Sequence, residues 1–227
     1  MMIPSKLGKY LVDCRTFPAD AALSYRLTGM RGVWEVIADR TIYRVVRTGR
    51  VVVFAQLLES APDVPAPAGV VIRALSGDDW PALSRIATQR TLASFRTLAA
   101  NGRHGLVAWR GAEAIGYGWV AERIGSDVTA CPLPLPPYAA YLWDLYVVPA
   151  ERSSGVGSAL ASARVQLARR LGFKEGWRMI APSNGASLRT LARTGRDTRT
   201  VGELRYIKIF ASMRSRFSPI SSPAPLS

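Results

Sequence analysis

The hydrophobic pattern changes its period between residues 141 and 172. Residues 141–148 (YLWDLYVV) are aromatic or aliphatic apart from one aspartate. This predicts a buried strand that ends at Pro149, because proline has no backbone donor. From residue 156 to residue 171 apolar side chains recur at helical spacing, and Gly172 follows as a stop. Four polar residues are expected on the other faces of this helix: Arg164, Gln166, Arg169 and Arg170.

Shorter patterns predict further elements on both sides of this unit. Alternating apolar positions predict strands at 70–75, 177–181 and 204–210, and a hairpin of 105–110 with 114–122. Acidic residues open a predicted helix at 78–83, and another helix is predicted at 184–193. These patterns indicate a β-rich domain that also contains helices.

Proline-rich stretches divide the chain. Residues 60–69 (SAPDVPAPAG) have the composition of a connector, so residues 1–68 are expected to form an N-terminal extension and residues 69–211 the main domain. Residues 131–138 (CPLPLPPY) predict an ordered loop near the substrate, just before the strand at 141–148. The Ser- and Pro-rich residues 212–227 are expected to be disordered.

The N-terminal extension is open to two interpretations. Residues 30–47 place Val and Ile side chains at near-helical spacing with arginines between them. This predicts a basic helix that packs on the main domain or lies on a membrane surface. A hairpin of 41–47 with 51–57, turning at 48–50, fits the β-branched residues almost as well.

Charge and cysteine content bear on the ligands, the redox state and the cellular location of the protein. The chain carries a formal net charge of +14, which fits an anionic cofactor and leaves nucleic acid, an anionic membrane surface or a composition bias open. Cys14 and Cys131 lie far apart and lack metal-ligand spacing, so free thiols and no metal are expected. Because neither a signal-peptide pattern nor a long apolar run is found, a cytoplasmic location is expected.

The loop at 152–157 (RSSGVG) joins the central strand to the helix. Its two glycines let a ligand approach backbone amides that have no partner within the helix, at the positive end of the helix dipole. A phosphate or pyrophosphate is therefore the expected ligand. No Gly-Lys-Ser/Thr follows, which excludes a P-loop, and Leu160 stands where a dinucleotide fingerprint has Gly or Ala.

The order Val-x-Pro, then Arg-x-x-Gly-x-Gly at a helix start, resembles the acetyl-CoA signature of the GNAT N-acetyltransferase family. The resemblance implies an α/β (α+β) fold with a mixed, mostly antiparallel sheet flanked by helices. It also implies acetyl-CoA as acyl donor and a small-molecule or peptide amine as acceptor, and leaves the oligomeric state open, a dimer included. The residues implied to bind the donor are Leu145, Tyr146, Val147, Arg152, Ser153, Ser154, Gly155, Val156, Gly157, Ser158, Asn184 and Ser187.

The resemblance further implies where the catalytic groups lie. Many members carry a carboxylate that acts as the general base on the strand before Val-x-Pro, and Asp144 is the only carboxylate there. Strand alternation would place it on the face of Leu142 and Tyr146, opposite Trp143. Glu122 is the second candidate for the base, whereas the single histidine, His104, is expected in a solvated turn.

The proton donor to the leaving thiolate is less clear from the sequence. Many members carry a tyrosine on the helix after the signature, and Leu191 replaces it here. Tyr146, Tyr206 and solvent are the remaining candidates for the acid. Two functions therefore stay open: an enzyme that transfers an acetyl or longer acyl group to an amine, and a catalytically degenerate module that binds CoA for regulation or interaction.

Overall fold

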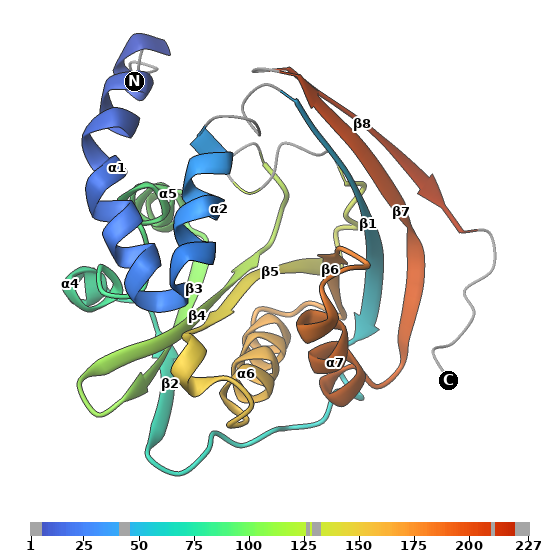
Figure 1. Cartoon of the computed structure of the whole chain (residues 1–227). Helices are drawn as coiled ribbons and strands as arrows, with labels where there is room; N and C mark the ends of the chain where they lie inside the picture. The colour runs from blue at the N-terminus through green and yellow to red at the C-terminus, as the bar shows by residue number, and fades with distance from the viewer. Residues whose placement is uncertain (1–5, 41–45, 126–127, 129–132, 210–211, 221–227) are drawn as a thin grey trace.

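One sheet connects most of the chain. A computed structural model describes residues 6–40, 46–125, 128, 133–209 and 212–220. Its strands form an eight-stranded sheet in the order β2-β3-β4-β5-β6-β1-β7-β8 (Figure 1). The strands are β1 (Val46–Leu57), β2 (Val70–Ala74), β3 (His104–Arg110), β4 (Glu113–Ala121), β5 (Ala139–Val147), β6 (Glu175–Ile180), β7 (Thr198–Ile209) and β8 (Ser212–Pro219).

Helices lie on both sides of this sheet. In Figure 1, α6 and α7 lie below the sheet and α1, α2 and α5 lie on its other side. Two short 3₁₀ turns, Gly77–Asp79 and Pro149–Glu151, precede α4 and α6. The helices are α1 (Lys6–Thr28), α2 (Met30–Arg40), α4 (Trp80–Leu83), α5 (Gln89–Ala100), α6 (Val156–Arg170) and α7 (Gly185–Thr194).

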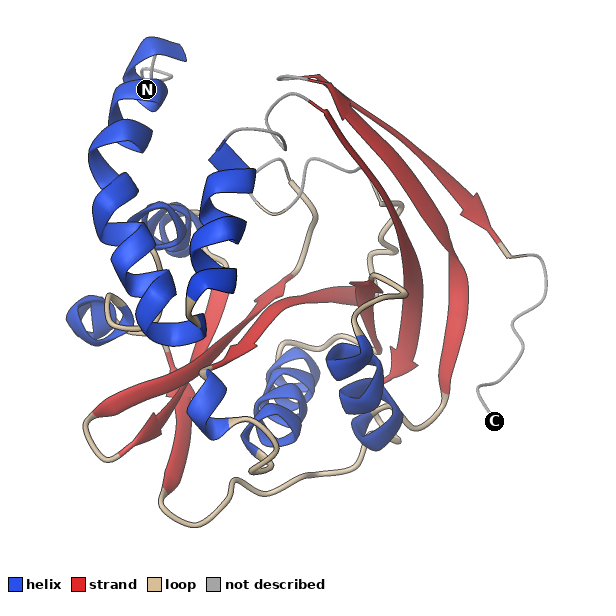
Figure 2. Ribbon diagram, viewed as in Figure 1, coloured by secondary structure: helices blue, strands red, loops and turns tan. Residues whose placement is uncertain are grey.

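Only one pair of neighbouring strands in the described sheet is parallel. β5 and β6 pair over residues 139–141 and 175–177, whereas the other neighbours are antiparallel. Past these residues the described parts of β5 and β6 share no further pairing, although β5 runs on to Val147 and β6 to Ile180 (Figure 2). The expected mixed, mostly antiparallel sheet with flanking helices is confirmed, and it is open between β5 and β6.

The core holds β4 and β5 between α5 and α6. The ring of Phe95 on α5 lies 4.7 Å from that of Tyr117 and 5.1 Å from that of Trp119, centroid to centroid. From α6, Val156 and Leu160 are fully buried in the same cluster. Because full burial of each large apolar side chain contributes about 1.5–3 kcal/mol, this cluster fixes the strands that carry the candidate site.

The expected division at residues 60–69 differs from the structure. β1 does not belong to a separate extension, since it lies between β6 and β7 in the sheet. It is one continuous strand through 48–50, so the hairpin expected there does not form, and α2 ends at Arg40. The place of β1 in the sheet and the absence of the hairpin have one cause. β1 pairs with strands more than a hundred residues away, and no local pattern reveals such pairing.

The connector and the C-terminal stretch also differ from expectation. In the connector, Val64 N donates to Ser162 Oγ at 3.0 Å, and the same hydroxyl donates to Pro62 O at 3.2 Å, so this segment lies along α6. Residues 212–219, expected to be disordered, form β8 and pair with β7. Residues 221–227, residues 131 and 132 of the proline-rich loop and the side chain of Cys14 lie outside the description, whereas residues 133–138 form neither helix nor strand.

Helix α1 is tied to α5 by a buried carboxylate. Asp20 is 2% exposed, and its Oδ1 accepts a hydrogen bond from Gln89 N, the first residue of α5, at 2.8 Å. Neither helix was predicted from the sequence. The apolar residues of α1 are spread around the helix instead of forming one stripe, and Pro18 stands near its middle, where a sequence pattern would predict a break.

Replacing Asp20 with alanine is expected to lower the free energy of unfolding by about 1–2 kcal/mol, because a helix-start amide then loses its acceptor. Urea unfolding followed by circular dichroism measures the change. Asp20→Asn keeps an acceptor oxygen and is expected to retain about half or more of the wild-type contribution. An Asp20→Ala protein as stable as the wild type would show that this contact does not hold α1 to α5.

Candidate active site

A bulge in β5 shapes the centre of the site. β4 pairs Tyr117 with Tyr146 and Trp119 with Trp143, so two residues of β5 lie opposite the single residue Gly118. One of the two is Asp144, whose φ of 48° lies in the left-handed region. Asp and Asn adopt this region more readily than most residues. The extra residue bends the strand and changes the direction of the side chains that follow it.

The bulge corrects the expected alternation along β5. Trp143 and Tyr146 were expected on opposite faces, but both lie over the same face of β4. The ring of Tyr146 stacks on Tyr117 at 5.3 Å, and the ring of Trp143 lies 6.0 Å from Trp119, centroid to centroid. The simple period of two therefore stops at Asp144, because a bulge shifts the register by one residue.

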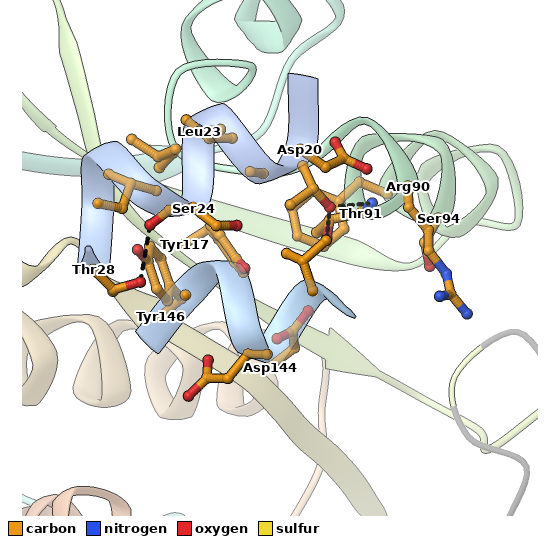
Figure 3. A pocket seen from close by; sticks show the side chains of 18 residues that line it. Asp20, Leu23, Ser24, Thr28, Arg90, Thr91, Ser94, Tyr117, Asp144 and Tyr146 are labelled. Atoms are coloured by element: carbon orange, nitrogen blue, oxygen red, sulfur yellow. Dashed lines mark hydrogen bonds between the residues drawn. The ribbon is translucent and has the colours of Figure 1, made fainter. Parts of the chain in front are cut away.

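Asp144 and Tyr146 line two cavities. The helix-side cavity, of about 560 Å³, lies between α1, α2, α5 and the β4–β5 strands. In Figure 3 the labelled side chains of Asp20, Ser24 and Thr28 surround it together with Tyr117, Tyr146 and Asp144. The loop-side cavity, of about 730 Å³, is lined by β5, the loop at 152–157, the end of β6 and α7. Among the residues that the structure describes, only Asp144 and Tyr146 belong to both linings.

The carboxyl group of Asp144 has a raised pKa. The side chain is exposed and lines the cavities. The surrounding protein atoms nevertheless disfavour its negative charge and raise its pKa to about 6. The positive charge of Arg164 opposes this shift. At neutral pH the group is thus an anion with a proton affinity well above that of an ordinary aspartate. That is the property required of a general base.

Two tyrosines line the helix-side cavity together with Asp144. Burial, then the charge of Asp144 and the neighbouring Tyr146, raises the pKa of Tyr117. Burial also raises the pKa of Tyr146, opposed by Arg152, whose guanidinium lies 6.0 Å from the Tyr146 ring centroid. Both hydroxyls therefore stay protonated at neutral pH and can donate.

Glu122, His104 and Tyr206 are not brought to these cavities. Glu122 is 53% exposed and pairs with His104, whose Nε2 lies 3.3 Å from Oε1. Tyr206 lies on β7 beside Gly49 of β1. None of the three lines either cavity. Of the sequence candidates for base and acid, the structure brings together Asp144 and Tyr146.

The loop at 152–157 opens α6 with two residues of positive φ. Ser153 has a φ of 64° and Gly155, the residue before the helix, has a φ of 93°. The loop is closed by two hydrogen bonds, from Arg152 Nε to Val147 O at 3.2 Å and from Ser154 Oγ to Glu151 O at 2.6 Å. The first amides of α6 have no intrahelical partner, so they are available to an anion.

Most of the expected donor-binding residues meet in the loop-side cavity. Its lining includes Leu145, Tyr146, Val147, Arg152, Ser153, Gly157, Asn184 and Ser187. Ser154, Gly155, Val156 and Ser158 do not line it, and Val156 is a core residue. Asn184 also begins α7, because its Oδ1 accepts from Ser187 N at 3.1 Å.

Leu191 has a structural role in α7. It is 2% exposed and packs with Phe54 and Ile180. The following turn closes through a hydrogen bond from Gly195 N to Leu191 O at 2.7 Å. The position that carries a hydroxyl group in many family members is thus apolar and buried here.

Two arginines of the loop-side cavity were missed from the sequence. Arg164 on α6 and Arg178 on β6 are 4% and 5% exposed. Arg164 was expected on a polar face of α6, but that helix is covered on two sides, by the sheet and by the connector bound to Ser162. The only sequence signal is its position, four residues after the buried Leu160 and thus on the same side of the helix.

Within the described residues, no group of three or more His, Cys, Asp and Glu side chains is placed to hold a metal ion. Likewise, no helix of the described chain combines the length and apolar character needed to cross a membrane.

Comparison with known proteins gives one family. Residues 71–195 match the sequence model of the acetyltransferase (GNAT) family, which confirms the resemblance inferred from the loop. No curated protein matches the chain.

Similar solved structures include three with related folds. A Drosophila protein superposes with a TM-score of 0.56 at 19% identity, covering 78% of this chain and 56% of its own. The GCN5-related glucosamine N-acetyltransferase region of a fungal multi-domain GH3 beta-N-acetylglucosaminidase has a TM-score of 0.54 at 12% identity, covering 75% and 22%. A GCN5-related N-acetyltransferase from Sphaerobacter thermophilus has a TM-score of 0.51 at 16% identity, covering 78% and 56%. The chain thus spans between a fifth and three fifths of these proteins, and they share its fold.

Proposed function

We propose, from the premise that this chain belongs to the GNAT acetyltransferase family, that it is an acyl-CoA-dependent N-acyltransferase. It would transfer an acetyl group from acetyl-CoA to a primary amine by direct attack in a ternary complex. The observation that carries the proposal is that Asp144 and Tyr146 line both cavities. A donor in the loop-side cavity and an acceptor in the helix-side cavity would meet at these two residues.

The charges of the two cavities support this assignment. Three carboxylates, Asp20, Glu35 and Asp144, and one arginine, Arg90, line the helix-side cavity. Such a lining suits an ammonium group. The loop-side cavity has the opposite character: its described lining holds one carboxylate, Asp144, and six arginines, Arg31, Arg152, Arg164, Arg178, Arg189 and Arg193. Such a lining suits an anionic cofactor.

The loop also fits a phosphate-bearing donor. A Cβ added to Gly157 would approach only Val147 Cγ2, at 3.8 Å, so the space beside this backbone is open. The loop at 152–157 would hold the pyrophosphate of CoA through the first amides of α6. Leu145, Tyr146 and Val147 would line the pantetheine arm, and Asn184 and Ser187 would contact it from α7.

The chain's own residues would supply the proton transfers. When bound, acetyl-CoA supplies an acyl carbon, to which the amine nitrogen bonds while the carbon–sulfur bond breaks and CoA leaves as its thiol. Asp144 would accept the proton of the ammonium group, directly or through water. The Tyr146 hydroxyl, which stays protonated, would give its proton to the sulfur and would regain one from the nitrogen, which loses its second proton as the amide forms.

A second candidate function is a module that binds CoA without turnover. Leu191 favours it, because this buried residue replaces the hydroxyl that many family members use as acid. Incubation with acetyl-CoA and a diverse panel of amines, reading free thiol, separates the two functions. Thiol release with at least one amine supports the enzyme, and CoA binding without release by any amine supports the module.

Gly157→Asp is expected to weaken CoA binding by about tenfold or more, because it adds a negative charge beside the phosphate site. Calorimetric titration of CoA measures the dissociation constant. Gly157→Ala adds only a Cβ at ordinary contact distance. It therefore separates the effect of added volume from the effect of added charge, and it should bind CoA nearly as the wild type does. Unchanged affinity in a folded Gly157→Asp protein would remove the loop from the donor site.

A further inference from the structure

Two buried arginines lie in the loop-side cavity without a carboxylate partner. Arg164 comes from α6 and Arg178 from β6, and each is at most 5% exposed. No ion pair joins either guanidinium to a carboxylate within 4.0 Å among the described residues. Burying a cation without such a partner is costly, so this pair needs an explanation.

Each arginine donates to a neutral acceptor and also has a buried Nε without a partner. Arg164 Nη1 donates to Trp143 O at 2.9 Å, and Arg178 Nη2 donates to Gln56 Oε1 at 2.6 Å. Gln56 is itself fixed, because its Nε2 donates to Thr194 O at 2.6 Å. The Nε of both arginines is buried without a hydrogen-bond partner in the described structure. Two buried Nε donors in the lining of one cavity thus have no acceptor among the described residues.

Room for Arg164 is built into the neighbouring strand. A Cβ added to Gly118 would come within 2.9 Å of Arg164 Cδ. Gly118 is also the residue opposite the bulge that carries Asp144. The guanidinium therefore reaches the reacting end of the cavity, beneath the bulge.

The two guanidinium groups act on one another electrostatically. Burial, and then the charge of Arg178, lowers the pKa of Arg164 to about 9, against the opposing effect of Asp144. Burial lowers the pKa of Arg178 to about 10. An anion near both would offset this repulsion and the loss of hydration.

Burial separates these arginines from the other four in the cavity. Arg31, Arg152, Arg189 and Arg193 are exposed, as expected for groups that meet solvated phosphates near the loop. Arg164 and Arg178 line the loop-side cavity and do not line the helix-side cavity. An anion that reaches them would therefore belong to the donor, at its acyl end, and not to the acceptor.

We propose that the preferred donor is a CoA thioester of a short dicarboxylic acid, whose free carboxylate is bound by Arg164 and Arg178. Planar guanidinium groups bind carboxylates through paired, charge-assisted hydrogen bonds. The inference rests on the proposed acyl transfer and changes only the acyl group. The same carbon–nitrogen bond forms and the same carbon–sulfur bond breaks, while the distal carboxylate keeps its charge throughout.

The test compares donors of equal length by calorimetry, so it does not depend on knowing the amine. Succinyl-CoA and butyryl-CoA have four acyl carbons each and differ in the terminal carboxylate. The wild-type protein is expected to bind succinyl-CoA about tenfold or more tightly than butyryl-CoA. Equal affinities, with both esters bound, would overturn the inference and leave the proposed function standing. Failure to bind CoA or either ester would overturn the proposed function itself.

Variants separate a specific site from the overall positive charge. Arg178→Met is expected to abolish the preference for succinyl-CoA with little change for butyryl-CoA, and Arg178→Lys to restore part of it. Arg193→Gln changes an exposed arginine of the same cavity and should weaken the binding of both esters by the same factor. A preference that survives in folded Arg178→Met protein would overturn the inference. If that variant does not fold, the comparison of the two esters in the wild type still decides.

Discussion

Replacing Asp144 with asparagine is expected to lower kcat/KM by about 10²-fold or more and to leave CoA affinity nearly unchanged. The carboxylate would accept a proton during transfer, and an amide cannot. Asparagine is the suitable replacement because it tolerates the left-handed backbone of the bulge, where φ is 48°. Steady-state kinetics with an amine found in the panel measures the effect.

The pH dependence gives a second measurement on the same residue. Because the pKa of Asp144 is raised to about 6, wild-type kcat/KM should rise through pH 6 as the carboxylate loses its proton. Asp144→Asn should lose this acidic limb. An unchanged limb in the variant would move the base from Asp144 to another group or to solvent.

Stability separates a catalytic Asp144 from a structural one. Its folded pKa of about 6 lies above the ordinary aspartate value of 3.8, so the folded state binds the proton more tightly. Ionisation of this group therefore lowers stability as pH rises from about 4 to 6, and the loss persists above pH 6. Asp144→Asn is expected to melt at or above the wild-type temperature at pH 7. Lower melting with full activity per folded molecule would indicate a structural role.

Asp197 provides a matched control for these experiments. It has a φ of 52°, is exposed and lines neither cavity. Asp197→Asn thus makes the same chemical change in the same backbone region, away from the site. It should keep both the rate and the acidic limb.

Removing residues 1–68 is expected to abolish cooperative folding of the remaining chain. The deletion takes β1 from between β6 and β7, which leaves two unpaired strand edges inside the sheet. It also removes Val53, Ala55 and Leu58, each 0% exposed. Since full burial of Val and Leu side chains contributes about 1.5–3 kcal/mol each, the loss approaches the stability of a whole domain. Thermal unfolding of residues 69–227, followed by circular dichroism, tests this.

A cut chain provides the control for the deletion. A protease site inserted after Glu59 and cleaved in the folded protein breaks the connector but keeps β1 in the sheet. The nicked protein should retain a cooperative melting transition, because both pieces remain paired. A cooperative transition for 69–227 alone, close to that of the full chain, would show instead that β1 is dispensable and that the proline-rich connector is a domain boundary.

Local chemistry determined the central unit of this protein from the sequence alone. The strand before Pro149, the loop at 152–157 and the helix from Val156 were predicted nearly to the residue. Each depends on features within a few positions: a residue without a backbone donor, glycines at a helix start and apolar side chains at a period of 3.6. The same locality made the family recognisable, because the phosphate site is built from consecutive amides.

Only the tertiary structure decided the strand order, the bulge and the burial of the arginines, because each depends on residues far apart in the sequence. β1 enters the middle of the sheet through strands at 175–180 and 198–209. The bulge at Asp144 arises from the register of β5 against β4, in which two residues lie opposite Gly118. The burial of Arg164 arises from the sheet above α6 and the connector bound to it. The sequence offers both Asp144 and Glu122 as candidates for the base, and of the two only Asp144 lines the cavities. Strand order, register and the sides of a helix that become covered depend on long-range packing, which leaves little trace in the local pattern.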